Sequence, residues 1–346
     1  MHPEEMRVTE LDERLASRVP ASLFGVVLGL AGLANAWRAA HTAWHLPAAI
    51  GETLFFAAVA AWLAVTSLYV LKWFQATDLA LAESEHPVQC CFIGLAGVST
   101  LLIAQGALSF SRALAIFLFV VGAAATLTFA LWRTGRLWRG ARSPASTTPV
   151  LYLPMVAGCF VSGTVASNLG WQDWGQLFFG GGFFAWLAIE SVLLHRLYTG
   201  ETLPPALRPT LGIQLAPPAV GAVSYLSVGQ GAPDLMAHAM IGYAILQALL
   251  LIRMSRWITE QGFSASYWAF TFGATALAAA SIRLVPINGE GAMTAIAPAV
   301  FILTNSLVIG VATGTVRLIL QGKLFPPPFA STLHDTQKCN HNGEMR

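Results

Sequence analysis

The sequence predicts an all-α integral membrane protein whose ten transmembrane helices pair as five hairpins. The first observation is composition, because the 346 residues are 55% hydrophobic and only 10% charged, whereas about a quarter of a soluble domain is charged. The mean hydropathy is +0.62, so too few charged residues remain to cover a core of this size in water. The other two observations are a series of long apolar runs and an asymmetric distribution of lysine and arginine. Together they exclude a water-soluble enzyme.

Each apolar run is long enough to cross the hydrocarbon core of a bilayer, which takes about 20 residues of helix. Runs such as LAIFLFVVGAAATLTFALW are apolar on every side, whereas the strands of a membrane barrel alternate apolar and polar residues. The predicted helices are 20–37, 48–71, 87–108, 113–132, 149–168, 175–195, 209–228, 235–252, 264–282 and 292–316. The transmembrane domain is therefore predicted to span 20–322, between polar tails at 1–19 and 323–346.

The basic residues orient these helices. With the N-terminus in the cytosol, sixteen lysines and arginines lie on the inner side, and only Arg38, Arg112 and Arg283 lie on the outer side. Basic loops are retained in the cytosol, so both termini are predicted to be cytosolic. The first residues carry five acidic side chains, unlike a cleaved signal peptide, and we expect this tail to be kept.

The odd-numbered predicted helices differ from the even-numbered ones. They contain no Lys, Arg, Asp or Glu and carry Gly or Pro at interior positions, which bend helices and permit close approach. Several even-numbered helices are richer in bulky side chains, so we expect the odd helices at the centre and the even helices at the perimeter. A weak repeat places a phenylalanine shortly before a glycine in four odd helices: Phe24/Gly25, Phe92/Gly94, Phe160/Gly163 and Phe272/Gly273.

The polar groups of the odd helices are hydroxyls and amides, among them those of Gln105, Thr164 and Gln214. A lining with dipoles but no fixed cation binds an anion weakly, which favours passage over capture. These helices hold no arginine fork of the kind that recognises a dicarboxylate tightly, and the chain has no GxxxxGK[ST] motif of an ATP-driven pump. The four cysteines have no zinc or disulfide spacing, and a net charge of +2 is too small to indicate nucleic acid. We expect no metal, no cofactor and no nucleic-acid partner.

Glu190 is the carboxylate placed deepest in a predicted helix. A carboxylate in hydrocarbon is costly and is a functional candidate by default, here as a proton site. Alternatively it pairs with His195 or Arg196, or reaches the inner interface. Arg38 and Arg283, at the outer ends of odd helices, either concentrate anions at a pore mouth or anchor their helices at the interface.

Seven stretches carry a resemblance to a known family. They are PASLFGVVLGLAGLANAW, HPVQCCFIGL, YLPMVAGCFVSG, LFFGGGFFAWLAIESVLLHRL, PTLGIQLAPPAVGAVSYLS, GYAILQALLLIR and YWAFTFG. In this order they resemble the tellurite-resistance/dicarboxylate transporter family, which includes the slow-type anion channels of plant guard cells. The resemblance implies a quasi-fivefold arrangement of five hairpins around a central pore, and a homotrimer with one pore in each subunit. It also implies a gating phenylalanine on the ninth helix, which the last stretch places at Phe272, and a second pore phenylalanine at Phe92.

The expected function is a passive channel, not an enzyme, for small inorganic or organic anions in a bacterial inner membrane. We expect the pore lining to include Phe24, Gly25, Phe160, Gly163, Thr271, Gly273 and Thr275. We expect Gly273 to leave room for the Phe272 ring to swing. The alternative is a proton-coupled transporter that exports C4-dicarboxylate, sulfite or tellurium oxyanions, with Glu190 as its proton site.

Overall fold

A computed structural model describes residues 19–140, 143–229, 234–285 and 290–325. The statements below concern those residues. The predicted N-terminal tail, apart from Val19, and most of the predicted C-terminal tail lie outside them.

Helices without any strand make up the described chain, as the composition predicts. Nine helical segments of this part of the chain are long and apolar enough to cross a membrane, and the chain is a multi-pass membrane protein. The predicted helix 264–282 corresponds to a four-residue 3-10 turn, η7 (Ala265–Trp268), followed by the 15-residue α12 (Ala269–Arg283). Ten spans in a fivefold arrangement therefore stay a prediction.

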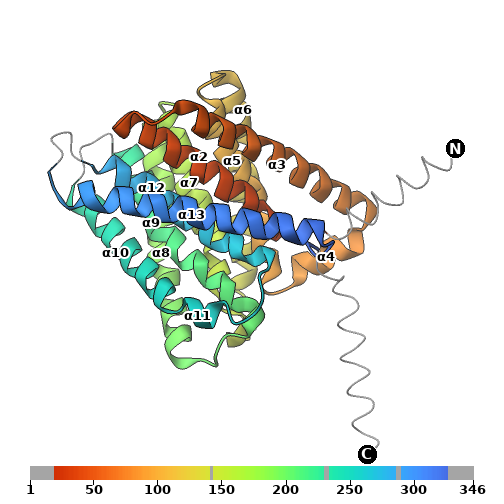
Figure 1. The fold of residues 1–346 in the computed structure, drawn as a ribbon. Helices are drawn as coiled ribbons and strands as arrows, with labels where there is room; N and C mark the ends of the chain where they lie inside the picture. Colours follow the sequence, from red (N-terminus) through yellow and green to blue (C-terminus); the bar gives the residue numbers. More distant parts are fainter. Residues whose placement is uncertain (1–18, 141–142, 230–233, 286–289, 326–346) are drawn as a thin grey trace, which may run out of the picture.

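The helices lie side by side in one bundle (Figure 1). The other α-helices are α2 (Phe24–Trp44), α3 (Ala48–Gln75), α4 (Thr77–Glu85), α5 (Leu95–Ala107), α6 (Arg112–Leu137), α7 (Gly158–Asn168), α8 (Gln172–Thr199), α9 (Ala216–Val228), α10 (Leu235–Arg253), α11 (Ser255–Ile258) and α13 (Ala292–Leu320). The remaining 3-10 segments are η1 (Ala21–Leu23), η2 (Gln89–Gly94), η3 (Pro144–Ser146), η4 (Pro149–Leu151) and η6 (Pro205–Leu215), and η5 (Leu153–Ala157) is a π-helix.

Burial alternates along the chain between two groups of helices. In the candidate spans that contain α2, α5, α7 and α9, between 56% and 83% of the residues in the apolar 18-residue stretch of each span are buried inside the protein. The spans of α3, α6, α8, α10 and α13 are only 17–33% buried, and nearly all of α12 is buried. We call α2, α5, α7, α9 and α12 the inner helices and the other group the outer helices. This division agrees with the predicted difference between odd and even helices.

Each inner helix is preceded by a short helical segment that is not α-helical: a π-helix before α7 and a 3-10 helix before each of the others. The segments are η1 before α2, η2 before α5, η5 before α7, η6 before α9 and η7 before α12. Prolines explain two of them, because Pro154 lies in η5 and Pro209 lies inside η6, and a proline removes a backbone donor from the α-helical ladder. These turns gather at the N-terminal ends of the inner helices, where they shape one end of the candidate pore.

Glycines bring α2 close to α12. A Cβ atom at Gly29 would lie 2.4 Å from Thr271 Oγ1, and one at Gly32 would lie 2.2 Å from Thr275 Oγ1. The absence of a side chain at these two positions therefore lets the helices approach closely, as small residues do in membrane bundles.

Candidate functional site: two cavities separated by a phenylalanine

Two internal cavities lie among the inner helices, and Phe272 lines both of them. We call the one at the N-terminal ends of the inner helices the N-terminal cavity and the other the C-terminal cavity. The first has a volume of about 70 Å³ and the second about 40 Å³. The ring of Phe272 is 92% buried, at 8% exposure. Phe272 is the one described residue that the two linings share.

The N-terminal cavity is lined mainly by apolar side chains from the turns that precede the inner helices. Phe92 lines this cavity but not the other. Its polar lining residues are Ser22, Gln89, Thr210 and Ser266.

The C-terminal cavity is lined by all five inner helices. Its polar lining residues are Asn35 from α2, Gln105 from α5, Thr164 from α7 and Thr275 from α12. Val220 and Val223 come from α9. Neither cavity has an Asp, Glu, Lys, Arg or His among the described residues that line it.

Four of the expected site residues lie in these linings. Phe272 lines both cavities, Phe92 and Gly25 line the N-terminal cavity, and Thr275 lines the C-terminal cavity. A Cβ atom at Gly32 would be 3.7 Å from the Phe272 ring, so this glycine of α2 lies beside the ring.

Gly273 has a different environment from the one expected. A Cβ atom there would lie 2.9 Å from the backbone nitrogen of Ala216 and 3.0 Å from the backbone of Leu215. The glycine therefore brings α12 against the start of α9, and it is not among the lining residues of either cavity. The space that the sequence reasoning assigned to Gly273 is provided beside the ring by Gly32.

The remaining expected lining residues lie behind the cavity walls. Phe24 is 1% exposed and its ring packs edge-on against Tyr69, with centroids 5.7 Å apart. Phe160 is fully buried beside Phe179 and Trp186 of α8. These rings face the outer helices, because an inner helix must also bury the side that joins it to its perimeter.

Gly163 and Thr271 also serve helix packing. A Cβ atom at Gly163 would be 3.0 Å from the carbonyl oxygen of Gly175 in α8. Thr271 is fully buried against Gly29, and its hydroxyl donates to the carbonyl of Trp268 at 2.8 Å.

The sequence reasoning did not select Asn35 or Ser266 for the lining, and it named Gln105 only as one of several polar side chains. The sequence could have indicated Asn35 as a lining residue, because it is an amide within an otherwise apolar run of α2. Ser266 lies in the turn η7, and hydrophobic periodicity does not predict which face such a turn presents.

Glu190 lies in α8, is 8% exposed, and lines neither cavity. The alternative in which it pairs with His195 or Arg196 is wrong for the described residues, since neither is among its hydrogen-bond donors and Arg196 donates to the carbonyl oxygens of Pro144 and Glu201. The carboxylate instead accepts five neutral hydrogen bonds. The donors are Tyr152 at 2.5 Å, Tyr243 at 2.6 Å, Trp186 at 2.8 Å, Gln214 at 3.0 Å and Gln247 at 3.5 Å.

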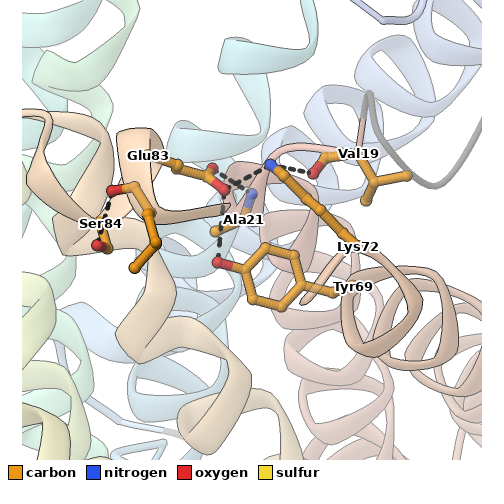
Figure 2. A network of polar contacts seen from close by, with 7 residues as sticks. Val19, Ala21, Tyr69, Lys72, Glu83 and Ser84 are labelled. Atoms are coloured by element: carbon orange, nitrogen blue, oxygen red, sulfur yellow. Dashed lines mark hydrogen bonds and ion pairs between the residues drawn. The ribbon is translucent and has the colours of Figure 1, made fainter. Parts of the chain in front are cut away.

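A second buried carboxylate, Glu83 of α4, holds the start of the first inner helix (Figure 2). Lys72 Nζ lies 2.8 Å from Glu83 Oε2, and the backbone N–H of Ala21 donates to Glu83 Oε1 at 2.8 Å. Lys72 also donates to the carbonyl of Val19 at 3.0 Å, and Tyr69 donates to Glu83 at 3.4 Å. This network ties η1 to α3 and α4.

The imidazole of His86 supports the turn that carries Phe92. Its Nδ1 accepts the backbone N–H groups of Val88 and Gln89, both at 3.1 Å. Burial lowers the pKa of His86, against an opposing effect of the Glu83 carboxylate. The neutral ring is therefore favoured, and only the neutral ring can accept these bonds.

The two arginines at the other end of the inner helices have different partners. Arg38 forms a two-pronged ion pair with Glu52, at 2.9 and 2.8 Å, so its charge is compensated. Arg283 donates to the carbonyl of Val223 at 3.3 Å and to the hydroxyl of Ser227 at 3.1 Å.

Comparison with known proteins identifies the family. Residues 18–316 match the SLAC1 family model, described as "Voltage-dependent anion channel". The chain belongs to this family. The family resemblance expected from the sequence is thereby confirmed.

Three relatives show how far the similarity extends. The chain is 32% identical to the tellurite resistance protein TehA homolog of Haemophilus influenzae, over 89% of this chain and 93% of the relative. It is 27% identical to the S-type anion channel SLAH3 of Arabidopsis thaliana, over the whole chain but only 56% of the plant protein. The guard cell S-type anion channel SLAC1 of the same plant is 24% identical over 77% of this chain and 50% of its own length.

Proposed function

We propose that this protein is a passive channel for small anions, and that the ring of Phe272 closes its pore. The observation that carries the proposal is the position of Phe272 between two uncharged cavities. An apolar ring in a narrow passage removes the water that an ion needs, so one side chain can prevent conduction. Family membership supports an anionic substrate.

The lining supports a channel over a carrier. A carrier that captures a dicarboxylate or an oxyanion needs strong charge-assisted contacts, whereas the described lining residues of both cavities are uncharged. Glu190, the candidate proton site of the alternative, accepts five hydrogen bonds away from both cavities. Its role there is to join α8 to its neighbours.

Replacement of the ring tests the proposal. Phe272→Ala should raise anion current in planar bilayers at least about tenfold, because it removes a hydrophobic constriction. Phe270→Ala is the matched control: this ring is rotated by about 200° around the helix and packs on Gly212 and Tyr267. Equal currents in Phe272→Ala and wild type, at equal amounts of assembled protein, would contradict the gate.

A second variant separates the channel from the carrier. Glu190→Gln should keep the Phe272→Ala current within about threefold, because the carboxylate lies outside the conduction path. Loss of uptake driven by a pH gradient, in protein that still assembles, would instead support the proton-coupled carrier.

We also propose a homotrimer in a bacterial inner membrane with both termini in the cytosol. The basic-residue asymmetry supports the orientation, and the family resemblance supports the trimer. Of the glycines in α8, Gly182 packs within the subunit against Phe160, whereas a Cβ at Gly180 would meet no atom within 4 Å. Gly180 is therefore the glycine available for contact with a neighbouring subunit.

A further inference from the structure

The hydroxyl groups of the C-terminal cavity have no hydrogen left for an ion. Thr164 donates to the carbonyl of Phe160 and Thr275 donates to the carbonyl of Phe272, both at 3.0 Å. A hydroxyl has a single hydrogen. Once it is given to the helix backbone, the oxygen presents only lone pairs to the cavity, and lone pairs repel an anion.

The two amides of this cavity differ from the hydroxyls. Asn35 and Gln105 are partly buried lining residues, and among the described residues neither side chain donates to a protein group. Each amide nitrogen carries two N–H donors. These donors are therefore the groups of the C-terminal cavity that can replace water around an anion.

We propose that Asn35 and Gln105 form the anion-solvating site of the C-terminal cavity, and that its ligand is a small, singly charged inorganic anion. This inference rests on the proposed channel function. The amides lie on adjacent inner helices, α2 and α5, and line the same cavity as Phe272. An ion that has passed the ring exchanges part of its hydration shell for their N–H groups.

The size and charge of the site select the ligand class. The cavity volume of about 40 Å³ corresponds to about three or four water-sized particles, since one such particle needs about 10–15 Å³ on this measure. Chloride or nitrate fits this space, whereas a C4-dicarboxylate does not. Two neutral amides also solvate an anion with one negative charge better than an anion with two, because desolvation of a dianion costs far more than desolvation of a monoanion.

The cations near this end of the pore do not supply the same contact. Arg38 is paired with Glu52, so its field at the cavity is largely cancelled. Arg283 donates to the backbone of Val223, a lining residue, and can attract anions to the mouth. Neither guanidinium is part of the lining.

The test uses bilayer recordings of purified full-length protein in the conducting Phe272→Ala background. Reversal potentials between chloride, nitrate and malate solutions give the permeability ratios. Asn35→Leu/Gln105→Leu should lower chloride conductance at least about tenfold and raise the nitrate-to-chloride ratio several-fold, because chloride is the more strongly hydrated ion and loses more when donors are removed. Malate should remain impermeant.

Three further variants complete the test. Gln176→Leu is the matched control, because this amide of α8 lies outside both cavities and donates to the carbonyl of Val228 at 3.5 Å. It should change neither the chloride conductance nor the nitrate-to-chloride ratio. Thr164→Val/Thr275→Val should shift the ratio less than removal of the amides. If the double leucine variant does not assemble, Asn35→Asp replaces it, since a nearly isosteric carboxylate should also reduce chloride current at least about tenfold.

The outcomes separate this inference from the channel proposal. Absence of current in assembled Phe272→Ala protein would refute the gated channel itself. Two results would overturn the amide site alone, provided that Phe272→Ala protein conducts. One is a nitrate-to-chloride permeability ratio that does not change when both amides are removed. The other is a ratio that changes more in the threonine variant than in the amide variant. Malate permeability equal to that of chloride would overturn the assigned ligand class.

Discussion

Two buried glutamates are compensated in different ways, and the difference reflects their positions. Glu83 lies near the end of the bundle that carries η1 and pairs with the ammonium group of Lys72. Glu190 lies within α8 and is surrounded by neutral donors from four segments of the chain. A buried carboxylate needs either a counter-charge or several hydrogen bonds, and both solutions link helices that are distant in sequence.

The Lys72–Glu83 pair should be important for stability. Both side chains are almost completely buried, at 5% and 2% exposure, and removal of one partner leaves an uncompensated charge, at a cost of about 3–5 kcal/mol. We expect Lys72→Met to lower the free energy of unfolding in detergent by that amount, and Lys72→Met/Glu83→Gln to cost less than the sum of the single changes. The exposed Lys323→Met is the control. An effect of Lys72→Met no larger than that of the control would show that the pair is not a stabilising link.

Acidification should weaken the turn that carries Phe92. Because burial lowers the pKa of His86 below its usual 6.5, the stability it contributes is complete above that value and is lost as the pH falls through the lower folded-state value. Protonation removes an acceptor from two backbone N–H groups, which costs about 1 kcal/mol or more. Melting temperatures measured between pH 7.5 and 5.0 should fall more for wild type than for His86→Asn, whose side-chain oxygen accepts the same bonds at any pH. If the melting temperatures of the two proteins fell equally between pH 7.5 and 5.0, this role of His86 would be contradicted.

At the residue scale, the family resemblance of the stretch around Phe272 selected a ring that lines both cavities, and its gating role stays a prediction. The contacts of Glu190 were not predicted. The partners of Glu190 were missed because Tyr152 and Tyr243 lie 38 and 53 residues away. His195, which is near in sequence, lies about 140° around the helix from Glu190. Sequence proximity was therefore the wrong guide to its partner.

At the scale of elements, the apolar runs predicted most helices closely, but they did not predict how the inner helices begin. The run 209–228, for example, is the 3-10 segment η6 followed by α9. Hydrophobicity reports burial, which is the same for both kinds of helix. Segments η5 and η6 contribute Leu153 and Thr210, among others, to the lining of the N-terminal cavity.

Contact between α2 and α12 should be intolerant of added volume. A methyl group at Gly29 would lie 2.7 Å from the ring of Trp268 and 2.4 Å from Thr271 Oγ1. We therefore expect Gly29→Ala to lower the free energy of unfolding by about 1–3 kcal/mol, as overpacking does. Gly242→Ala on α10 is the matched control, with no atom within 4 Å of the added carbon. Comparable thermal stability of the two variants would mean that α2 and α12 can separate without cost.

At the scale of the whole molecule, composition was sufficient to predict an inner and an outer group of helices, because a helix that faces lipid and one that faces protein need different side chains. It did not predict α4, which follows α3 and contributes Glu83 to the network at the start of α2. The mixed polarity of α4 resembles that of a loop, and its role depends on contacts with η1 that are only visible in the fold.

The orientation of the molecule can be tested at two exposed serines. Ser109, between α5 and α6, is close to a single arginine, Arg112, whereas Ser143 follows the basic end of α6. Because basic loops remain in the cytosol, we expect Ser109→Cys to react with a membrane-impermeant maleimide on intact cells, and Ser143→Cys to react only after permeabilisation. The experiment uses a Cys159→Ser/Cys339→Ser background, because Cys159 is only partly buried. Cys90 and Cys91 are fully buried and should stay unlabelled in the parent protein. Labelling of Ser143→Cys on intact cells, with Ser109→Cys protected, would reverse the proposed orientation, and would make the C-terminal cavity the one that faces the cytosol.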